Sequence, residues 1–149
     1  MAAAILHGKS LEIDSPNFVV TSSGTSAYHE GEPAHHLSQE VWERHGFDYR
    51  HKSRPFKKQS FMDTDLILVA DQTNRAMIFG ATNFQNDKNK VFLLREFDSS
   101  LSVIDPFGSD SGQLVIPDPW GSQIEAYEEV YAQIEKAVDG LIHYFTSER

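Results

Sequence analysis

A short apolar run in the middle of the chain constrains the fold more than any other feature. Residues 66–70 (LILVA) form an uncharged run of the kind found in strands that are buried on both faces. Residues 91–94 (VFLL) are a second such run, and Asp71 lies between the two as the N-cap of an intervening helix. Two buried strands separated by a helix predict a parallel sheet covered by helices, because parallel strands need a crossover connection.

Further elements precede this pair of strands. Residues 2–6 predict a short helix that Gly8 ends, and residues 17–21 (NFVVT) predict another strand. Residues 37–42 carry the apolar stripe of a helix, and Gly46 stands where a left-handed cap would end it. We therefore expect an α/β fold, with a small parallel sheet flanked by helices on both faces.

The end of the chain predicts the longest helix. Its apolar residues recur at spacings of three and four, which indicates an amphipathic helix packed on a core. Ser122 and Glu125 match a capping box at its start. Before this helix lies a connection of about 25 residues, a length that indicates a functional loop. The apolar stripe consists of Ile124, Tyr127, Tyr131, Ile134, Val138, Leu141 and Phe145.

The composition excludes several classes of function. The chain has 149 residues, of which 40% are apolar and 23% charged, as expected for one globular domain over residues 1–149. Its net charge of −9 disfavours nucleic acid as a partner, and its apolar runs are too short to span a membrane. The chain contains no cysteine, which removes disulfides, cysteine-based metal sites and every cysteine nucleophile. Seven histidines leave acid–base chemistry open.

The strongest candidate for chemistry is Asp118. It lies between Pro117 and Pro119 and shortly before Trp120, so two prolines stiffen the backbone and an aromatic ring stands near the carboxyl group. That arrangement suits a general acid, which must meet a leaving group within hydrogen-bond reach. The alternative is an aspartate in a turn that only begins the last helix.

Three other segments are weaker candidates. Residues 22–26 (SSGTS) offer hydroxyls and amides to an anion, but they match no phosphate-binding loop, so a solvated loop is the simpler interpretation. His29, His35 and His36 lack the spacing of a metal site, so no metal is expected. Residues 44–58 hold six of the 13 Lys and Arg residues, which indicates either an anion-facing patch or a solvated connector.

Four segments taken together resemble the low-molecular-weight protein-tyrosine phosphatase family. They are residues 22–33 (SSGTSAYHEGEP), 45–55 (HGFDYRHKSRP), 61–74 (FMDTDLILVADQTN) and 117–121 (PDPWG), in an order and spacing that fit nearly the whole chain. The resemblance implies a four-stranded parallel sheet with helices on both faces. It also implies hydrolysis of phosphotyrosine through a phosphocysteine intermediate, without a metal or another cofactor.

The resemblance also implies a role for three residues at the substrate. Asp118 matches the general acid, which protonates the tyrosine leaving group and later activates water. Tyr28 and Trp120 match the aromatic walls that flank the substrate ring, although the family often has two aromatic residues after Asp-Pro and this chain has one.

A second set of matching residues belongs to the polar network that supports the family's phosphate loop. These residues are Ser22, His51 and Asp71. His35 and Leu37 stand where the family usually has Asp and Arg, so no role is carried over to them.

The chain departs from the family at its front. Residues 1–6 (MAAAIL) resemble the end of the family motif Cys-x5-Arg-Ser-Pro-Met-Ala-Glu-Ala, with Ala3 in place of Glu. The first, central strand, the nucleophilic Cys and the phosphate-binding Arg would therefore lie upstream of residue 1. Each buried backbone donor or acceptor that loses its partner costs about 1–3 kcal/mol, so we expect a gap in the sheet or a marginally stable chain.

We interpret the chain as an incomplete member of this family that starts at an internal Met. The full-length product would be a cytoplasmic phosphatase, most simply a monomer, that acts on phosphotyrosine-containing proteins or small aryl phosphates. The 149 residues alone are expected to be inactive. Two alternatives stay open: a non-catalytic module that binds partners through the remaining loops, and a relative that acts on phosphoarginine or arsenate.

Overall fold

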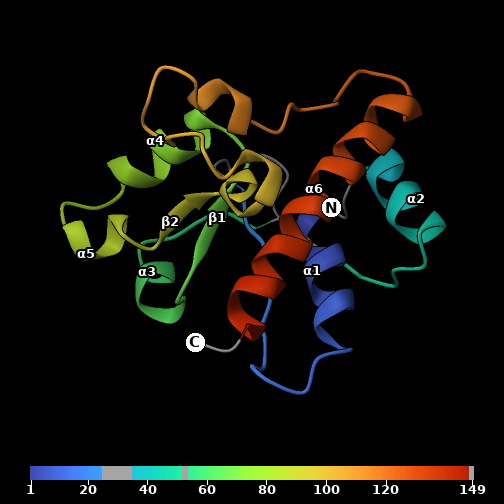
Figure 1. The fold of residues 1–149 in the computed structure, drawn as a ribbon, viewed down its shortest axis with the longest axis horizontal. Coiled ribbons are helices and arrows are strands. Elements are labelled where there is room, and N and C mark those ends of the chain that lie inside the picture. Colours follow the sequence, from blue (N-terminus) through green and yellow to red (C-terminus); the bar gives the residue numbers. More distant parts are fainter. Residues whose placement is uncertain (25–34, 52–53, 148–149) are drawn as a thin grey trace.

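The computed structural model describes residues 1–24, 35–51 and 54–147 (Figure 1). Its helices and strands, in chain order, are α1 (Ala2–Ser10), α2 (His36–Arg44), α3 (Ser60–Asp63), β1 (Ile67–Val69), α4 (Gln72–Gly80), α5 (Gln85–Lys88), β2 (Val91–Leu93) and α6 (Ile124–Thr146). Three short 3₁₀ helices lie between β2 and α6: η1 (Leu94–Phe97), η2 (Ser99–Leu101) and η3 (Ser111–Leu114). The segment predicted as one long loop therefore contains three short helical turns.

The two strands pair in parallel, as the sequence predicts. Ile67 lies opposite Val91 and Val69 opposite Leu93, and α4 forms the crossover between the strands. Asp71 caps α4 as expected, because its Oδ1 accepts a hydrogen bond of 2.7 Å from the backbone N–H of Asn74. The α/β class is thus confirmed for the described residues.

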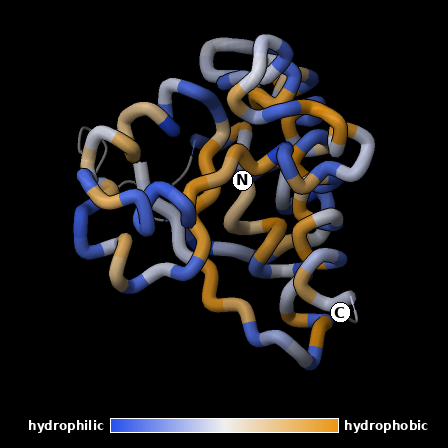
Figure 2. The backbone as a smooth tube through the Cα atoms, turned by 60° about the vertical axis from the view of Figure 1, so that its left-hand side comes forward, coloured by the Kyte–Doolittle hydropathy of each residue, from blue (hydrophilic) through white to orange (hydrophobic). Residues whose placement is uncertain are grey.

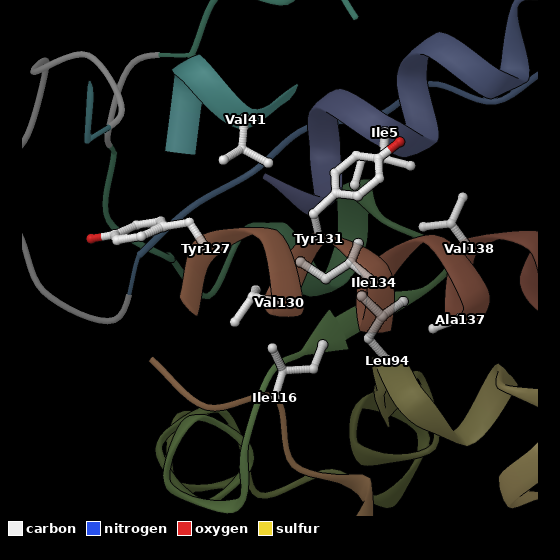
Figure 3. Close-up of a cluster of buried hydrophobic side chains, with 10 residues drawn as sticks. All are labelled: Ile5, Val41, Leu94, Ile116, Tyr127, Val130, Tyr131, Ile134, Ala137 and Val138. Carbon is white, nitrogen blue, oxygen red and sulfur yellow. The ribbon is translucent and has the colours of Figure 1, made fainter. Parts of the chain in front are cut away.

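Both faces of the sheet are covered, because successive residues of β1 point into two different cores. Ile67 and Val69 are buried among apolar residues of α3, α4, β2 and η3. Leu68 and Ala70 pack against a second cluster, which α1, α2 and α6 supply together with Leu94 and Ile116 (Figure 3). Figure 1 shows these two groups of helices on opposite sides of the strands. An apolar strand without polar alternation is the sequence counterpart of this arrangement.

The last helix is the main wall of the second core. Tyr127, Tyr131, Ile134, Val138 and Leu141 are all buried along it, so the predicted stripe is confirmed. The predicted capping box is wrong. The helix begins at Ile124 behind Gln123, which makes no side-chain cap. The Ser122 N–H instead bonds to the carbonyl of Pro119 at 2.9 Å, and Gly121 takes a φ of 82°, so a tight turn uses Ser122 before the helix starts.

Two glycines near the beginning of the fold differ in their roles. Gly46 ends α2 in the left-handed conformation with a φ of 88°, as predicted, and the neighbouring Phe47 N–H bonds to the carbonyl of Trp42 at 3.0 Å. Gly8 does not end a helix, because α1 continues to Ser10. A Cβ at Gly8 would lie 2.3 Å from the Phe47 ring, so this glycine makes room for a side chain from another segment.

The prediction of a strand at residues 17–21 is wrong. In the described part of the chain this segment has no strand assignment, and the sheet consists of β1 and β2 only. The segment contacts the last turns of α6 through a side chain, since the rings of Phe18 and Phe145 meet edge-on with centroids 6.0 Å apart. The β-branched pattern is present, but a strand also needs a neighbour with free backbone groups, and none of the described residues supplies one.

The distribution of hydropathy agrees with these two cores. Figure 2 shows the apolar parts of the chain passing mainly through the middle of the molecule, with hydrophilic segments on the outside. Within the described residues, no helix combines the length and the apolar character needed to cross a lipid bilayer.

Candidate functional site

The end of β1 gathers two of the predicted aspartates. Asp71 follows Ala70 directly, and the carbonyl of Ala70 accepts a hydrogen bond of 2.9 Å from the N–H of Ile116. Asp118 lies two residues beyond Ile116, on a segment that this bond holds against the end of the strand. Both carboxylates are therefore at the carboxyl end of β1, the edge at which parallel α/β sheets bind ligands.

A second part of the site joins two segments that are far apart in the sequence. The hydroxyl of Ser22 lies 2.7 Å from His51 Nδ1. Around this pair the backbone is fixed by an isolated parallel bridge, in which the Gly24 N–H bonds to the carbonyl of Arg54 at 2.7 Å and the Phe56 N–H to that of Gly24 at 2.8 Å. The structure thus brings together two of the three residues expected to support a phosphate loop.

The Ser22–His51 pair borders an open pocket of about 310 Å³. The Nε of Arg54 donates to the carbonyl of Ser22 at 3.1 Å and places a guanidinium group at the rim. Partial burial lowers the pKa of His51, and the nearby positive charges of the N-terminal ammonium and Arg54 lower it further. The pocket is lined by Val20, Thr21, Ser22, Tyr49, Arg50, His51 and Arg54.

The N-terminal amine of this chain is close to the same site. Burial lowers the pKa of the Met1 amine to about 6, and its charge acts on His51. The group is thus a second titratable base beside the pocket.

The turn that contains Asp118 leaves its carboxylate accessible to solvent. Its Oδ1 accepts a hydrogen bond of 3.0 Å from the N–H of Trp120, and the carboxylate is exposed. Trp120 is 75% exposed, so most of its surface is open to solvent. Among the described residues, Asp118 makes no hydrogen bond to Ser22 or His51. The acid candidate and the Ser22–His51 pair are therefore not joined by a direct hydrogen bond in the described residues.

Tyr127 is a neighbour of Asp118 for which the sequence pattern predicts only a place in the core. The residue is only 2% exposed, and its hydroxyl has no hydrogen-bond partner among the described residues. Burial raises its pKa, and the charge of Asp118 raises it further. Its position in the apolar stripe of α6 predicted a core residue, and only the fold places that hydroxyl near the acid candidate.

The remaining candidates are the substrate wall Tyr28 and the histidines near it in the sequence. Tyr28 and His29 lie outside the described residues. His35 is the N-cap of α2, where its Nδ1 accepts from the N–H of Leu37 at 3.3 Å, and its ring stacks on Tyr127 with a centroid distance of 5.4 Å. Across the described ranges, no group of three or more His, Asp or Glu side chains is arranged to hold a metal ion.

Comparison with known proteins places this arrangement in a class. The model of the family "Low molecular weight phosphotyrosine protein phosphatase" matches residues 1–149. A low molecular weight protein-tyrosine-phosphatase of Streptomyces coelicolor is 30% identical over 121 residues, which cover 81% of this chain and 69% of that protein. The human low molecular weight phosphotyrosine protein phosphatase is 31% identical over 120 residues, or 80% and 69% of the two chains. The chain therefore belongs to the low-molecular-weight phosphotyrosine protein phosphatase family.

A solved structure extends the comparison to another phosphoryl substrate. The YwlE arginine phosphatase from Geobacillus stearothermophilus is 25% identical to this chain, with a TM-score of 0.74. The match covers 99% of this chain and 88% of that one. The family fold is thus shared with a protein that is named for a different phosphorylated residue.

Proposed function

We propose that this protein takes part in the hydrolysis of phosphotyrosine. In this reaction Asp118 is the general acid and Trp120 forms one wall of the substrate site. Tyr28 would supply the opposite wall, and Ser22, His51 and Asp71 would support a phosphate loop. The observation that carries the proposal is the common position of Asp71 and Asp118 at the carboxyl end of β1, secured by the hydrogen bond from Ile116 to Ala70.

The chemistry at Asp118 follows from its surroundings. A general acid must reach the leaving oxygen of the phosphoester, and an exposed carboxyl group on a proline-stiffened turn is available for that contact. The exposed ring of Trp120, two residues away, offers an apolar surface to an aromatic leaving group. Phosphotyrosine in a protein and small aryl phosphates are the substrates that fit both features.

The nucleophile must come from outside these 149 residues. The family mechanism forms a phosphocysteine, and this chain has no cysteine. The Cys-x5-Arg loop, whose backbone N–H groups and arginine neutralise the phosphoryl oxygens in the transition state, does not occur in this sequence. We therefore propose that the 149-residue chain is inactive by itself, and that activity requires a Cys-x5-Arg segment preceding it in a longer cytoplasmic, monomeric product.

A non-catalytic binding module is the second candidate. The lack of cysteine favours it, because the Ser22–His51 pair and the polar pocket are in place while the nucleophile is not. The transcript upstream of the Met1 codon separates the two candidates. An in-frame Cys-x5-Arg-Ser-Pro motif supports the enzyme, and an in-frame stop codon without a spliced alternative supports the binding module.

The first prediction concerns turnover. We expect the purified 149-residue chain to release no phosphate from p-nitrophenyl phosphate above the rate of buffer, because it can form no covalent intermediate. Phosphoarginine serves as the parallel substrate, since a similar fold carries an arginine phosphatase. Turnover that disappears in Asp118→Ala would contradict the proposed inactivity, and turnover that survives this change would point to a contaminant.

In a longer product that contains the motif, Asp118→Asn tests the acid. We expect kcat for phenyl phosphate to fall by about 10²- to 10⁴-fold, the usual contribution of a general acid. The loss should be much smaller for an aryl phosphate with an acidic phenol as the leaving group, because that leaving group needs no proton. An equal loss with both substrates would contradict the assigned role.

A further inference from the structure

A second pocket lies at the C-terminal end of α6, away from the candidate site. Its volume is about 540 Å³, and η1, η2 and the last two turns of α6 line it, so we call it the α6 pocket. Gly140 lies on its wall, about 24 Å beyond Ile124 at a helical rise of about 1.5 Å per residue. Asp118 precedes Ile124, so the α6 pocket is separate from the sheet edge that carries the acid candidate.

The α6 pocket has a negative potential. The carboxylates of Glu96 and Asp98 line it, His143 is the only base among its described lining residues, and no lysine or arginine is among them. The charge of Arg75 acts on Glu96, whereas none of the described ion pairs includes Asp98. The pocket also adjoins the C-terminal end of α6, where the helix dipole is negative. These charges attract a cation to the pocket.

Asp98 is buried to an extent that is unusual for a carboxylate without a counter-ion. The residue is only 4% exposed, and aspartates are almost never fully buried unless they are paired. Its Oδ1 caps η2, because it accepts hydrogen bonds from the Ser100 N–H at 3.0 Å and from the Ser100 hydroxyl at 2.7 Å. Its Oδ2 makes no hydrogen bond to any described residue. One carboxylate oxygen at the wall of the pocket is therefore left for a ligand.

The groups around Asp98 decide which kind of cation fits. A guanidinium fork is best matched by two free acceptor oxygens, and Asp98 offers one. An ammonium group is a compact charge with three donors, and the hydroxyls of Ser99 and Ser102 on the same lining are further acceptors. The rings of Phe97 and Tyr144 meet edge-on with centroids 6.1 Å apart, and they give the wall an apolar part for a hydrocarbon stem.

We propose that the α6 pocket binds a primary alkylammonium cation, with Asp98 as the counter-ion and the rings of Phe97 and Tyr144 against the stem. A volume of about 540 Å³ holds an ammonium head together with a stem of several carbons. Binding needs no cysteine and no turnover, and it uses none of the residues placed at the candidate site. The proposal therefore does not depend on the proposed phosphatase activity.

The cation can be a free amine or the side chain of a lysine in another protein, and an NMR titration distinguishes these sources. The nitrogen-15-labelled 149-residue chain is titrated at pH 7 with n-pentylamine, with Nα-acetyl-L-lysine methylamide and with n-pentanol, which has the same stem without the charge. We expect both amines to saturate and to shift amide signals of residues 96–102 and 140–144, while n-pentanol does not saturate. Tighter binding of the lysine derivative identifies a lysine side chain as the ligand, and tighter binding of n-pentylamine identifies a free amine.

Two outcomes of this titration would overturn the proposal. One is equal affinity for n-pentanol and n-pentylamine, because the pocket would then recognise only the apolar stem. The other is the lack of saturation by either amine at up to about 10 mM. Both comparisons use the unaltered chain, so they decide the proposal without any variant that has to fold.

A substitution at Asp98 tests the counter-ion itself. Asp98→Asn keeps the shape and an oxygen that can cap η2 but removes the charge, so we expect the affinity for n-pentylamine to fall about 10-fold or more. Asp105→Asn is the matched control. Asp105 accepts the N–H of Phe107 at 2.9 Å in a turn of the same kind, and it does not line the pocket. Equal weakening by both substitutions, or unchanged affinity in Asp98→Asn, would overturn the proposal. Because the readout is the chemical shift, failure here leaves the turnover assays of the proposed function unaffected.

Discussion

At the scale of single residues, two bases beside the pocket have pKa values below their ordinary range. Burial lowers the pKa of the Met1 amine from 8.0 to about 6. Partial burial also lowers the pKa of His51, and the charges of the Met1 ammonium and of Arg54 lower it further. Ser22, at 2.7 Å, contributes a neutral hydroxyl that does not reverse this direction. Both bases therefore hold fewer protons in the folded chain than in the unfolded one.

These shifts predict a dependence of stability on pH. Between about pH 6 and 8 the unfolded amine is protonated and the folded one is not, so the free energy of unfolding should rise with pH by roughly 2 kcal/mol. Urea titrations at several pH values measure this change in the free energy of unfolding. Acetylation of the amine should remove most of the slope, and His51→Asn a smaller part near pH 6.5. A flat profile in the unmodified chain would contradict these assignments.

At the scale of elements, the crossing of α6 and η1 depends on one glycine. A Cβ built at Gly140 would lie 1.7 Å from the carbonyl oxygen of Phe97, so the helix and the 3₁₀ turn approach as closely as backbone permits. The sequence suggests only that this glycine weakens its helix by about 1 kcal/mol relative to Ala. The structure shows that it allows the contact on which the packing of α6 depends.

This close approach predicts opposite effects for one substitution at two sites. Gly140→Ala should lower the free energy of unfolding by about 3 kcal/mol, because the backbone of η1 must move away. Gly80→Ala is the control, since Gly80 is also helical and its Cβ would meet nothing within 4 Å. At Gly80 we expect the free energy of unfolding to rise by about 0.5 kcal/mol. Equal effects in urea unfolding would contradict the crowding at Gly140.

At the scale of the whole molecule, the sheet is small for the two layers of helices that cover it. In the described residues β1 pairs only with β2, and residues 17–21 run without a strand partner. The Ile67 N–H bonds toward β2, so the N–H of Leu68, one residue on, faces away from it. Leu68 is half-buried where Ile67 and Val69 are buried. The open edge therefore weakens the centre of the fold.

We expect the 149-residue chain to be marginally stable for this reason. Each unpaired buried backbone group costs about 1–3 kcal/mol, against a usual total of 5–15 kcal/mol. A thermal midpoint below about 45 °C is expected by circular dichroism, at the lower end of mesophilic domains. Hydrogen exchange should be faster at the Leu68 amide than at Val69. A cooperative transition above about 65 °C, with both amides equally protected, would contradict the open edge.

Much of the fold could be predicted because the signals are local. The apolar run before Asp71 has the pattern of a two-faced strand, and the spacing from Tyr127 to Leu141 has the period of a helix. The start of α6 could not be predicted in this way, because Ser122 serves two competing local motifs and the turn with Pro119 is the one that forms. The end of α1 was also missed, since Gly8 accommodates Phe47 from a distant segment.

The features of the candidate site also fall into those that the sequence determines and those that the tertiary structure decides. The residue types of Asp118, Ser22 and His51 and the lack of any cysteine are determined by the sequence alone, because composition and motif spacing need no coordinates. The 2.7 Å contact of Ser22 with His51 and the buried hydroxyl of Tyr127 beside Asp118 were decided only by tertiary structure. These contacts join segments that are far apart in the chain, and no local periodicity carries information about which distant side chains will meet.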